Sequence, residues 1–456
     1  MSDASRVTML EDVMTGHVAI GATGQVPEES AVGLAEINQI MFARGTNNIV
    51  KVLDRVTDLF KSWAIASIGF HSRNFMGGIF NNALAGVDAA SYKRFHALFG
   101  PVRQAMNEGA GIKEQILALR ASPAAKRASR TEEGRRAVAA MEEMIRYGVL
   151  SGGQTTELQD IVRARGAQSI NPLNPNNVVV NAARKPTTTV ENYLRGTLAM
   201  DRLMNGSDIT TAMSDVYKYH FDYADLSAFE RGVIRRVIPF YTWTRKNLPL
   251  QLEMMLTNPK IYNRMGSLKR EIERDADTEE YLPNWINERF NIQMPFKIGG
   301  DNVFMVPDLP FTEIDTTFNP RTILTMTSPA VKVPFEFLSD YDTFFQSSYN
   351  GRRDVVPNAW RVALGPFVDP LTKAGIFERN DRGALTIESS WLRWTESFLP
   401  VAGTLRRLIP TSEDPKTEER YLQNIVNWIS PIAFRRITER DQRSERLRRE
   451  NPNFFS

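Results

Sequence analysis

Cysteine is absent from this chain of 456 residues, and histidine is scarce. Without thiols the protein has no disulfide bond, no thiolate metal site and no cysteine nucleophile. The four histidines are His17, His71, His96 and His220, and no two of them lie at the spacing of a helical zinc pair. The chain also lacks a Walker loop, a GxGxxG fingerprint and a GxSxG elbow. We therefore expect no enzyme activity, no metal and no cofactor.

A large net charge is also missing. The 56 Lys and Arg residues are nearly balanced by 53 Asp and Glu residues, which leaves +3 at pH 7. Such a balance gives no overall field that favours nucleic acid. The first residues, Met1 to Ala4, show no basic stretch followed by an apolar run, so we expect no secretory signal. With 42% hydrophobic and 24% charged residues, the composition is that of a globular protein with a core.

No apolar run is long enough for a transmembrane helix, which needs roughly 20 mainly apolar residues. The most apolar stretch is residues 59–87, and among the residues that interrupt it are Lys61, His71, Arg73 and Asn74. A charge at mid-span costs about 2.5–3.5 kcal/mol, so we expect no constitutive transmembrane helix. The aromatic residues of this stretch that are candidates for membrane or partner-helix contact are Trp63, Phe70 and Phe75.

Small residues in the same stretch indicate close helix–helix packing: Gly69, Gly77, Gly78, Ala83, Ala85 and Gly86. Two hypotheses follow. We favour a helical hairpin in a soluble core. The alternative is a segment that inserts into a membrane only as an oligomer, with its polar residues facing a lumen.

Aromatic, basic and proline residues interleave most densely between Tyr219 and Pro249. Ser227 followed three residues later by Glu230 is a capping box, which predicts the start of a helix. Apolar residues then recur at helical spacing as one stripe: Phe229, Val233, Val237, Phe240 and Tyr241. Pro239 and Pro249 each remove a backbone donor, so we expect the helix to break at both positions.

The segment between these two prolines has two interpretations. Trp, Tyr, Arg and Lys are typical of a membrane–water interface, where rings lie at headgroup level and cations reach outward. The interpretation that we favour is a buried aromatic helix whose basic face packs on other helices. Both hold if the protein is packed in one state and membrane-bound in another. The candidate contact residues are Phe240, Tyr241, Trp243, Arg245 and Lys246.

The order of the helical and proline-rich stretches predicts a mainly α, elongated multi-helix assembly subunit. We expect a loose arm over residues 1–30, helices over 31–166, a linker over 167–189 and helices again over 190–290. Prolines recur over 291–387, which predicts a proline-rich extended segment with at most a small β-hairpin around Gly299 and Gly300. Residues 388–456 are expected to be helical, with Trp391 and Trp394 in an aromatic stripe.

Two basic clusters stand out against the low net charge. The C-terminal cluster is Arg435, Arg436, Arg440, Arg443, Arg446, Arg448 and Arg449. Acidic residues lie three or four positions away on the expected helix, so we expect much of this charge to be paired internally. We expect the cluster to contact acidic protein or lipid and to contribute little to DNA affinity. In the second cluster, Lys126 to Arg136, we favour a solvated helix face over a phosphate-binding patch.

Three segments resemble large phage proteins. The first reads FDYxDLSxFER from Phe221, followed by PFYTWTRKNLP from Pro239. The second is an FxxRNxxG pattern that begins at Phe70, and the third is the proline-punctuated stretch from Leu309 to Glu336. In order and spacing they cover most of residues 60–345. Together they are similar to polyvalent or internal virion (ejection) proteins of bacteriophages.

The resemblance implies a non-enzymatic virion protein that assembles with copies of itself and with portal, capsid or tail proteins. It implies localisation in the virion, and in the host cell envelope after infection, where contact with membrane lipid would help the genome to cross. A static minor structural protein without a membrane role is the alternative: portal-associated, minor capsid or tail component. A third hypothesis is a DNA-packing protein with non-specific DNA contact.

Overall fold

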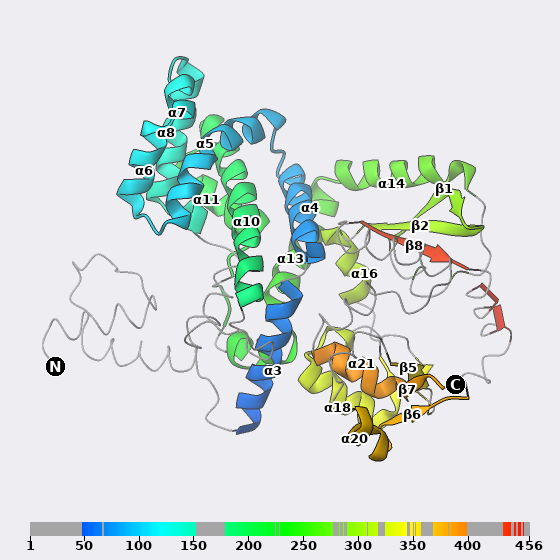
Figure 1. Ribbon diagram of the computed structural model, residues 1–456. Coiled ribbons are helices and arrows are strands. Elements are labelled where there is room, and N and C mark those ends of the chain that lie inside the picture. Colours follow the sequence, from blue (N-terminus) through cyan, green and yellow to red (C-terminus); the bar gives the residue numbers. More distant parts are fainter. Residues whose placement is uncertain are drawn as a thin grey trace, which may run out of the picture.

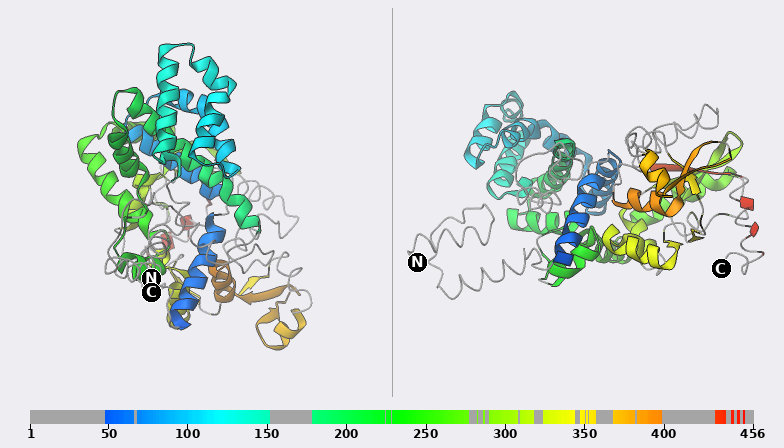
Figure 2. Two further views of the ribbon diagram at one scale, coloured as in Figure 1. Left: turned by 90° about the vertical axis from the view of Figure 1, so that its left-hand side faces the viewer. Right: turned by 60° about the horizontal axis from the view of Figure 1, so that its bottom comes forward.

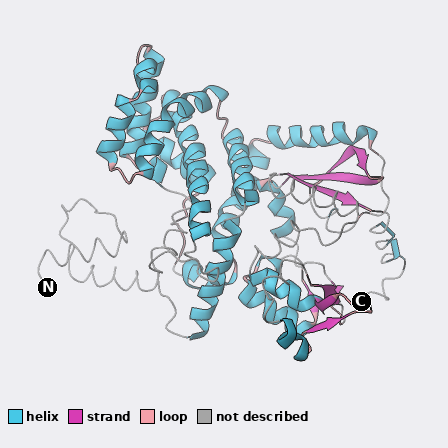
Figure 3. Ribbon diagram, viewed as in Figure 1, coloured by secondary structure: helices cyan, strands magenta, loops and turns pink. Residues whose placement is uncertain are grey.

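The computed structural model describes residues 48–65, 68–151, 178–276 (without 224 and 228), 290–307, 309–317, 324–343, 347–349, 353–356, 368–398 (without 382) and 432–438. It also describes residues 282, 286, 351, 442–443, 446–447 and 450. Within these ranges the chain is mainly α-helical, with three small β-sheets (Figures 1 and 3). The predicted fold class is confirmed.

The first part of the described chain is entirely helical. Its elements are α3 (Asn48–Ile65), α4 (Ile68–Leu84), α5 (Ala89–Asn107), α6 (Ile112–Ala121), α7 (Pro123–Ala128), α8 (Glu132–Arg146), the 3-10 turn η1 (Val149–Ser151), α10 (Val178–Met204) and α11 (Ile209–His220). Four of these helices begin at a side chain that accepts a hydrogen bond from the backbone N–H three residues on: Asp88, Ser122, Thr131 and Asp208. Such caps satisfy backbone donors that have no partner inside the helix.

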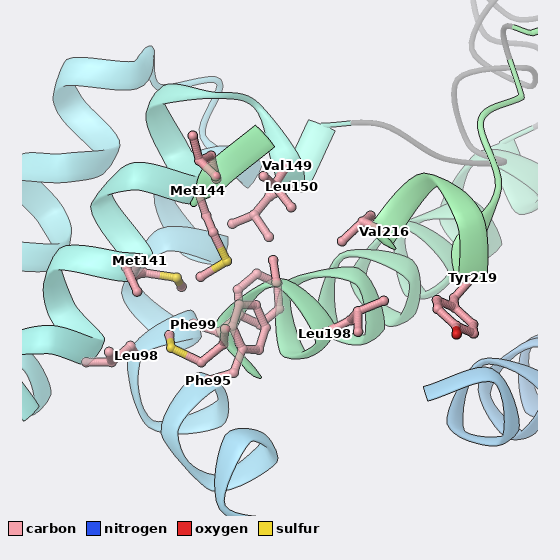
Figure 4. Packing of buried hydrophobic residues seen from close by; sticks show 14 of the residues in the cluster. Phe95, Leu98, Phe99, Met141, Met144, Val149, Leu150, Leu198, Val216 and Tyr219 are labelled. Atoms are coloured by element: carbon pink, nitrogen blue, oxygen red, sulfur yellow. The ribbon is translucent and has the colours of Figure 1, made fainter. Parts of the chain in front are cut away.

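The main hydrophobic core lies between α5, α8, α10 and α11 (Figure 4). Phe95 is fully buried and stacks on Phe99, with ring centroids 4.9 Å apart. Met141 and Met144 of α8 approach these rings, and Leu198 of α10 lies beside them. The core extends to α4 and α13, so it also supports the segment around Trp243.

α3 and α4 follow each other end to end (Figures 1 and 2). The hairpin predicted for residues 59–87 is therefore wrong for these two helices, because α4 continues away from α3 instead of folding back on it. α4 packs along α10 instead. No helix in the described ranges is both long enough and apolar enough to cross a bilayer.

α10 begins at Val178 and runs through Pro186, inside the range predicted as a linker. That part of the prediction is wrong. A proline removes a single helical hydrogen bond, and the C-terminal half of α10 is anchored by a run of buried residues from Glu191 to Asp201. This packing outweighs the local preference of the proline.

The second part of the described chain mixes helices and strands. Its helical elements are η2 (Glu230–Ile234), α12 (Arg235–Val237), α13 (Tyr241–Thr257), α14 (Lys260–Ile272), η3 (Glu273–Asp275), η4 (Pro310–Thr312), α16 (Glu313–Thr317), η5 (Leu324–Met326), α18 (Pro329–Ser339), α20 (Val368–Lys373) and α21 (Ser389–Phe398). Its strands are β1 (Ile292–Ile298), β2 (Asp301–Pro307), β3 (Tyr341–Asp342), β4 (Ser347–Ser348), β5 (Arg353–Val355), β6 (Phe377–Arg379), β7 (Leu385–Glu388) and β8 (Ile432–Ile437).

β1 and β2 form the predicted hairpin, and Ile298 pairs with Asp301 across the turn. Gly299 and Gly300 have φ of 61° and 87°, a conformation that glycine adopts without steric cost. β8 then pairs antiparallel with β2 as a third strand. A helix was predicted over residues 388–456, and at β8 this prediction is wrong.

The remaining strands form a β3–β4 pair and a β5–β7–β6 sheet. α21 packs on the β5–β7–β6 sheet and buries Leu392 against Phe377 and Ile387. α18 and α21 contact each other and also α3 (Figure 1). The first and second parts of the chain therefore meet along α3, α4 and α13.

Candidate functional site

The helix break predicted at Pro239 is present. α12 ends at Val237, Ile238 is extended, and α13 begins at Tyr241. Phe240 has φ 63°, a left-handed conformation that costs a bulky residue about 1–2 kcal/mol. Its ring lies 6.5 Å from that of Phe60 and 6.2 Å from that of Phe70. These contacts with α3 and α4 help to hold the strained residue in place.

The break predicted at Pro249 is wrong, because α13 continues through it to Thr257. Pro249 lies on the exposed face of the helix, whereas Asn247, Leu250 and Gln251 are buried. Burial of these residues stabilises the helix on both sides of the proline, so one missing backbone donor does not interrupt it.

The capping box predicted before this break is also present. The backbone N–H of Ser227 donates to Oε2 of Glu230 at 2.8 Å, and the N–H of Glu230 donates to Oγ of Ser227 at 3.2 Å. The turn that follows is π-helical. Phe229 is 63% exposed and Val233 is 47% exposed. The first half of the predicted apolar stripe therefore faces solvent, and only its second half packs inward.

α12 is held by contacts from two other helical elements. Arg236 forms an ion pair with Asp54 of α3, with Nε and Oδ1 2.7 Å apart. Thr57 Oγ1 donates to the carbonyl of Arg236 at 3.1 Å. From the start of α18, the N–H of Ser328 donates to the carbonyl of Val237 at 2.6 Å. The helix break is thus a junction between α3, α12 and α18.

The two cations of the segment are paired with carboxylates. Arg245 forms an ion pair with Glu230, which also accepts a hydrogen bond from the Tyr241 hydroxyl at 2.9 Å. The pKa of Glu230 is lowered to about 2, chiefly by its hydrogen bonds from Ser227. Lys246 forms an ion pair with Asp225. Arg245 is therefore paired with η2, and Lys246 with the loop that precedes it.

Trp243 is half-buried and has a polar anchor. Its indole N–H donates to both carboxylate oxygens of Glu313 in α16, each at 2.8 Å. Its ring meets Phe221 edge-on, with centroids 5.1 Å apart. Burying an indole requires such a partner for the N–H. The Trp243 segment is therefore fixed against the interior, as in the interpretation that we favoured from the sequence.

Next to Trp243, buried amides connect four parts of the chain. Asn247 donates to the carbonyl of Pro310 at 2.7 Å and accepts from Gln251 Nε2 at 3.0 Å. Gln251 also donates to Asn81 of α4 at 3.3 Å and accepts from the Tyr262 hydroxyl at 2.8 Å. Asn81, Asn247 and Gln251 are each at most 1% exposed. We call Asn81, Trp243, Asn247, Gln251, Tyr262 and Glu313 the α13 network.

A second buried cluster lies beside it. Asn82 donates its amide N–H groups to the carbonyl of Leu194 and the hydroxyl of Tyr92, so its Oδ1 accepts from His220 Nε2 at 2.7 Å. Burial, with a smaller effect of the Arg195 charge, lowers the pKa of His220 to about 3. The imidazole is thus neutral, with its proton on Nε2. Arg195 is 2% exposed and donates to the carbonyls of His220 and Phe221 at the end of α11.

Both clusters consist mainly of amides and backbone carbonyls. Such groups fix geometry, and leaving one of them unpaired in the interior costs about 1–3 kcal/mol. No group of three or more potential metal ligands occurs among the described residues. These hydrogen bonds connect α4, α11, α13, α14 and α16 with one another.

The other aromatic candidates belong to α3 and α4. Trp63 of α3 is 9% exposed, and Phe70 is half-buried against Phe240. Phe75 is at the surface, 37% exposed. The structure therefore brings Phe70 to the helix break and leaves Phe75 away from it.

The C-terminal arginines do not form one helical face. Arg435 and Arg436 lie on β8, and Arg436 forms an ion pair with Asp301 of β2 at 2.7 Å. The expected helix is wrong at these positions because strand pairing with β2 supplies the backbone partners. Arg446 pairs with Glu450 at 2.8 Å, as predicted for this cluster, and Arg443 is exposed. Arg440, Arg448 and Arg449 lie outside the described residues, as does the predicted arm over 1–30.

The buried amides were not predicted from the sequence. Asn81 and Asn82 are 138 positions from their partners Tyr219 and His220, and no local pattern connects them. One signal was available: two adjacent asparagines at the end of an apolar helix have to find partners inside the fold.

No family model matches this chain, and neither a curated protein nor a solved structure shows significant similarity to it.

Proposed function

We propose that this chain is a non-enzymatic bacteriophage virion protein of the internal, ejection type. In the particle it packs with copies of itself or with portal, capsid or tail proteins. At infection it leaves the particle and helps the genome to cross the host envelope. The sequence resemblance over residues 60–345 motivates this assignment.

The structural observation that supports the proposal is the anchoring of Trp243. The segment Tyr241 to Lys246 has the composition of a membrane interface. Glu313 holds Trp243 inward, and the carboxylates of Glu230 and Asp225 pair with Arg245 and Lys246. A protein that acts first in the particle and later at a membrane has to keep such a segment buried while it is in the particle. The α13 network consists of hydrogen bonds that are made together, so its members are expected to open together.

The static structural role is the second candidate, and the same anchoring favours it if the network never opens. The two functions differ in what happens to the protein when DNA leaves the particle. The decisive measurement compares the protein content of full and emptied particles of a phage that encodes this chain. Ejection predicts loss of the chain from emptied particles. Retention at full copy number would make the static role the correct one.

A second measurement tests membrane contact. Native protein should leave anionic vesicles intact and should permeabilise them after mild destabilisation, with a blue shift of the tryptophan emission that Trp243→Phe reduces. Glu313→Ala removes the acceptor of the indole N–H, so this variant should permeabilise vesicles at a lower denaturant concentration. Glu253→Ala is the matched control, because it removes a carboxylate of α13 that pairs only at the surface with Lys218. If vesicles have no effect on either variant under any condition, the membrane role is wrong.

A further inference from the structure

The turn between α7 and α8 carries an exposed basic surface. We call residues 123–136 the basic tip; it lies at the outer end of the helical part (Figures 1 and 2). Its cations are all exposed: Lys126, Arg127, Arg130, Arg135 and Arg136. Against them stand two acidic residues, Glu132 and Glu133. The 14 residues of the tip therefore carry +3, the same net charge as the whole chain.

In the part of the chain that the structure describes, these cations have no carboxylate partner. Glu133 is bound by Arg94 of α5 at 2.5 Å, so one of the two acidic charges is directed away from the tip. Lys126, Arg127, Arg130 and Arg135 form no ion pair with any other residue that the structure describes. In the C-terminal cluster, by contrast, Arg436 and Arg446 are both paired.

The backbone of the tip is fixed. Ser122 caps α7 and Thr131 caps α8, and Ala125 between them is 2% exposed. A Cβ at Gly134 would lie 1.9 Å from the carbonyl oxygen of Ala128, so only glycine allows α7 to approach α8 this closely. Arg136 also donates to the carbonyl of Met204 at 2.8 Å, which ties the tip to the end of α10. The cations thus project from a rigid turn.

We propose that the basic tip binds the phosphate backbone of double-stranded nucleic acid without reading its sequence. Four of its five cations are arginines, whose planar guanidinium matches two phosphate oxygens. Binding of several fixed cations to a polyanion releases counterions and needs no base contact. This proposal goes beyond the ejection role and does not depend on it.

A lipid surface fits the tip less well. Segments that bind membranes add large apolar side chains to their cations, and these enter the acyl boundary. Apart from its five cations and two glutamates, the tip contains only Pro123, alanines, Ser129, Thr131 and Gly134, and none of these is a large apolar residue. The chain does possess exposed aromatic and aliphatic residues, such as Phe229 and Phe337, but they belong to other elements.

The test is duplex binding by the full chain, followed by fluorescence anisotropy of a labelled duplex of about 30 base pairs. Each phosphate contact contributes about −0.9 to the slope of log affinity against log salt. We expect a slope of about −3 to −4 for the native protein, from the four unpaired cations. Lys126→Ala/Arg127→Ala/Arg130→Ala should reduce the slope by roughly 2.7 and the affinity at least about ten-fold at low salt. These three side chains form no intrachain hydrogen bond within the described ranges, so the variant should fold.

The matched control is Lys260→Ala/Arg264→Ala/Arg270→Ala. It removes one lysine and two arginines from exposed positions of α14, and it changes the net charge by the same amount. The control should bind the duplex like the native protein. Equal losses in both variants, no loss in the tip variant or no duplex binding by the native protein would overturn the proposal. A tip variant that loses binding to anionic vesicles and keeps duplex binding would overturn it as well.

Discussion

Trp243 donates its indole N–H to both carboxylate oxygens of Glu313, 70 residues further along the chain. Asn247, one helical turn after Trp243, donates to the same carboxylate at 3.2 Å. One face of α13 is therefore attached to α16 by two different side chains through a single acceptor. Exposing the Trp243 ring to solvent requires all of these bonds to break.

The first prediction concerns Gln251, the central residue of the α13 network. Gln251→Leu removes the donor to Asn247 and Asn81 and the acceptor of the Tyr262 hydroxyl. Each group left unpaired costs about 1–3 kcal/mol, so for three groups we expect a loss of at least about 3 kcal/mol in the free energy of unfolding. Urea unfolding followed by circular dichroism measures it. Gln104→Leu is the control, because Gln104 bonds only to Glu108 at the surface, and it should change the stability by less than about 0.5 kcal/mol.

The second prediction concerns the helix break. Tertiary contacts hold α12 and Phe240, namely Asp54 with Arg236 and the rings of Phe60 and Phe70. We therefore expect Pro239→Ala to leave the break in place and the helical circular dichroism signal unchanged. The free energy of unfolding should fall by about 0.5–1 kcal/mol, because alanine gives the unfolded chain more freedom than proline. A rise in helicity by a full turn would show that Pro239 alone maintains the break.

The outcome at the two prolines shows what local sequence can and cannot predict. The capping box at Ser227 depends on residues within a few positions of each other, and the break is marked in the sequence by Pro239, so both were predicted. Pro249 was expected to act in the same way, but its helix is stabilised by Asn247 and Gln251, whose partners lie 63 and 170 positions away. Distant contacts of this kind leave no periodic signal in the sequence.

The C-terminal strand illustrates the same limit. The charge pattern around Arg436 suits a helix, and in isolation that pattern favours one. In the fold, β8 completes the ladder of β2, and Val303 pairs with Arg436 across 133 residues. The hairpin of β1 and β2 was predictable because Gly299 and Gly300 lie between its strands. Its third strand was not, because nothing near β8 specifies β2 as its partner.

The third prediction concerns pH. The pKa of His220 is about 3 in the folded protein and has an ordinary value of 6.5 in the unfolded chain. Between these values the unfolded state binds the extra proton, so the free energy of unfolding falls as the pH falls, by up to about 1.4 kcal/mol per pH unit. Above about pH 6.5 the imidazole is neutral in both states and contributes no pH dependence.

The measurement compares unfolding free energies between about pH 6 and pH 4 in the native protein and in His220→Gln. Glutamine retains a donor toward Asn82 and cannot be protonated in this range, so the variant should show a shallower pH dependence. His96→Gln is the control, because it replaces an exposed histidine outside the cluster of Asn82 and His220. Parallel curves for the native protein and His220→Gln would mean that His220 is not buried in its neutral form.

The last prediction uses two adjacent glycines of α4 that face different neighbours. A Cβ at Gly78 would lie 2.3 Å from Cδ1 of Leu194 in α10, whereas a Cβ at Gly77 would lie 3.5 Å from Pro310, an ordinary contact. Leu194 is 2% exposed and has little room to move. Gly78→Ala should therefore push α4 away from α10 and lower the free energy of unfolding by about 1–3 kcal/mol. Gly77→Ala should raise it by about 0.5–1 kcal/mol, because alanine has the higher helix propensity.

Thermal unfolding of the two single variants decides between packing and propensity. If propensity dominates, both substitutions stabilise the helix by the same amount. If packing against α10 dominates at Gly78, the two midpoints move in opposite directions from the native value. The double variant Gly78→Ala/Leu194→Ala is the remaining control. It removes the clash between the new methyl group and Leu194, so the loss from overpacking should disappear. Truncating the buried leucine should itself lower the free energy of unfolding by roughly 2–5 kcal/mol. A Gly78→Ala protein as stable as Gly77→Ala would show that α4 and α10 do not approach each other this closely.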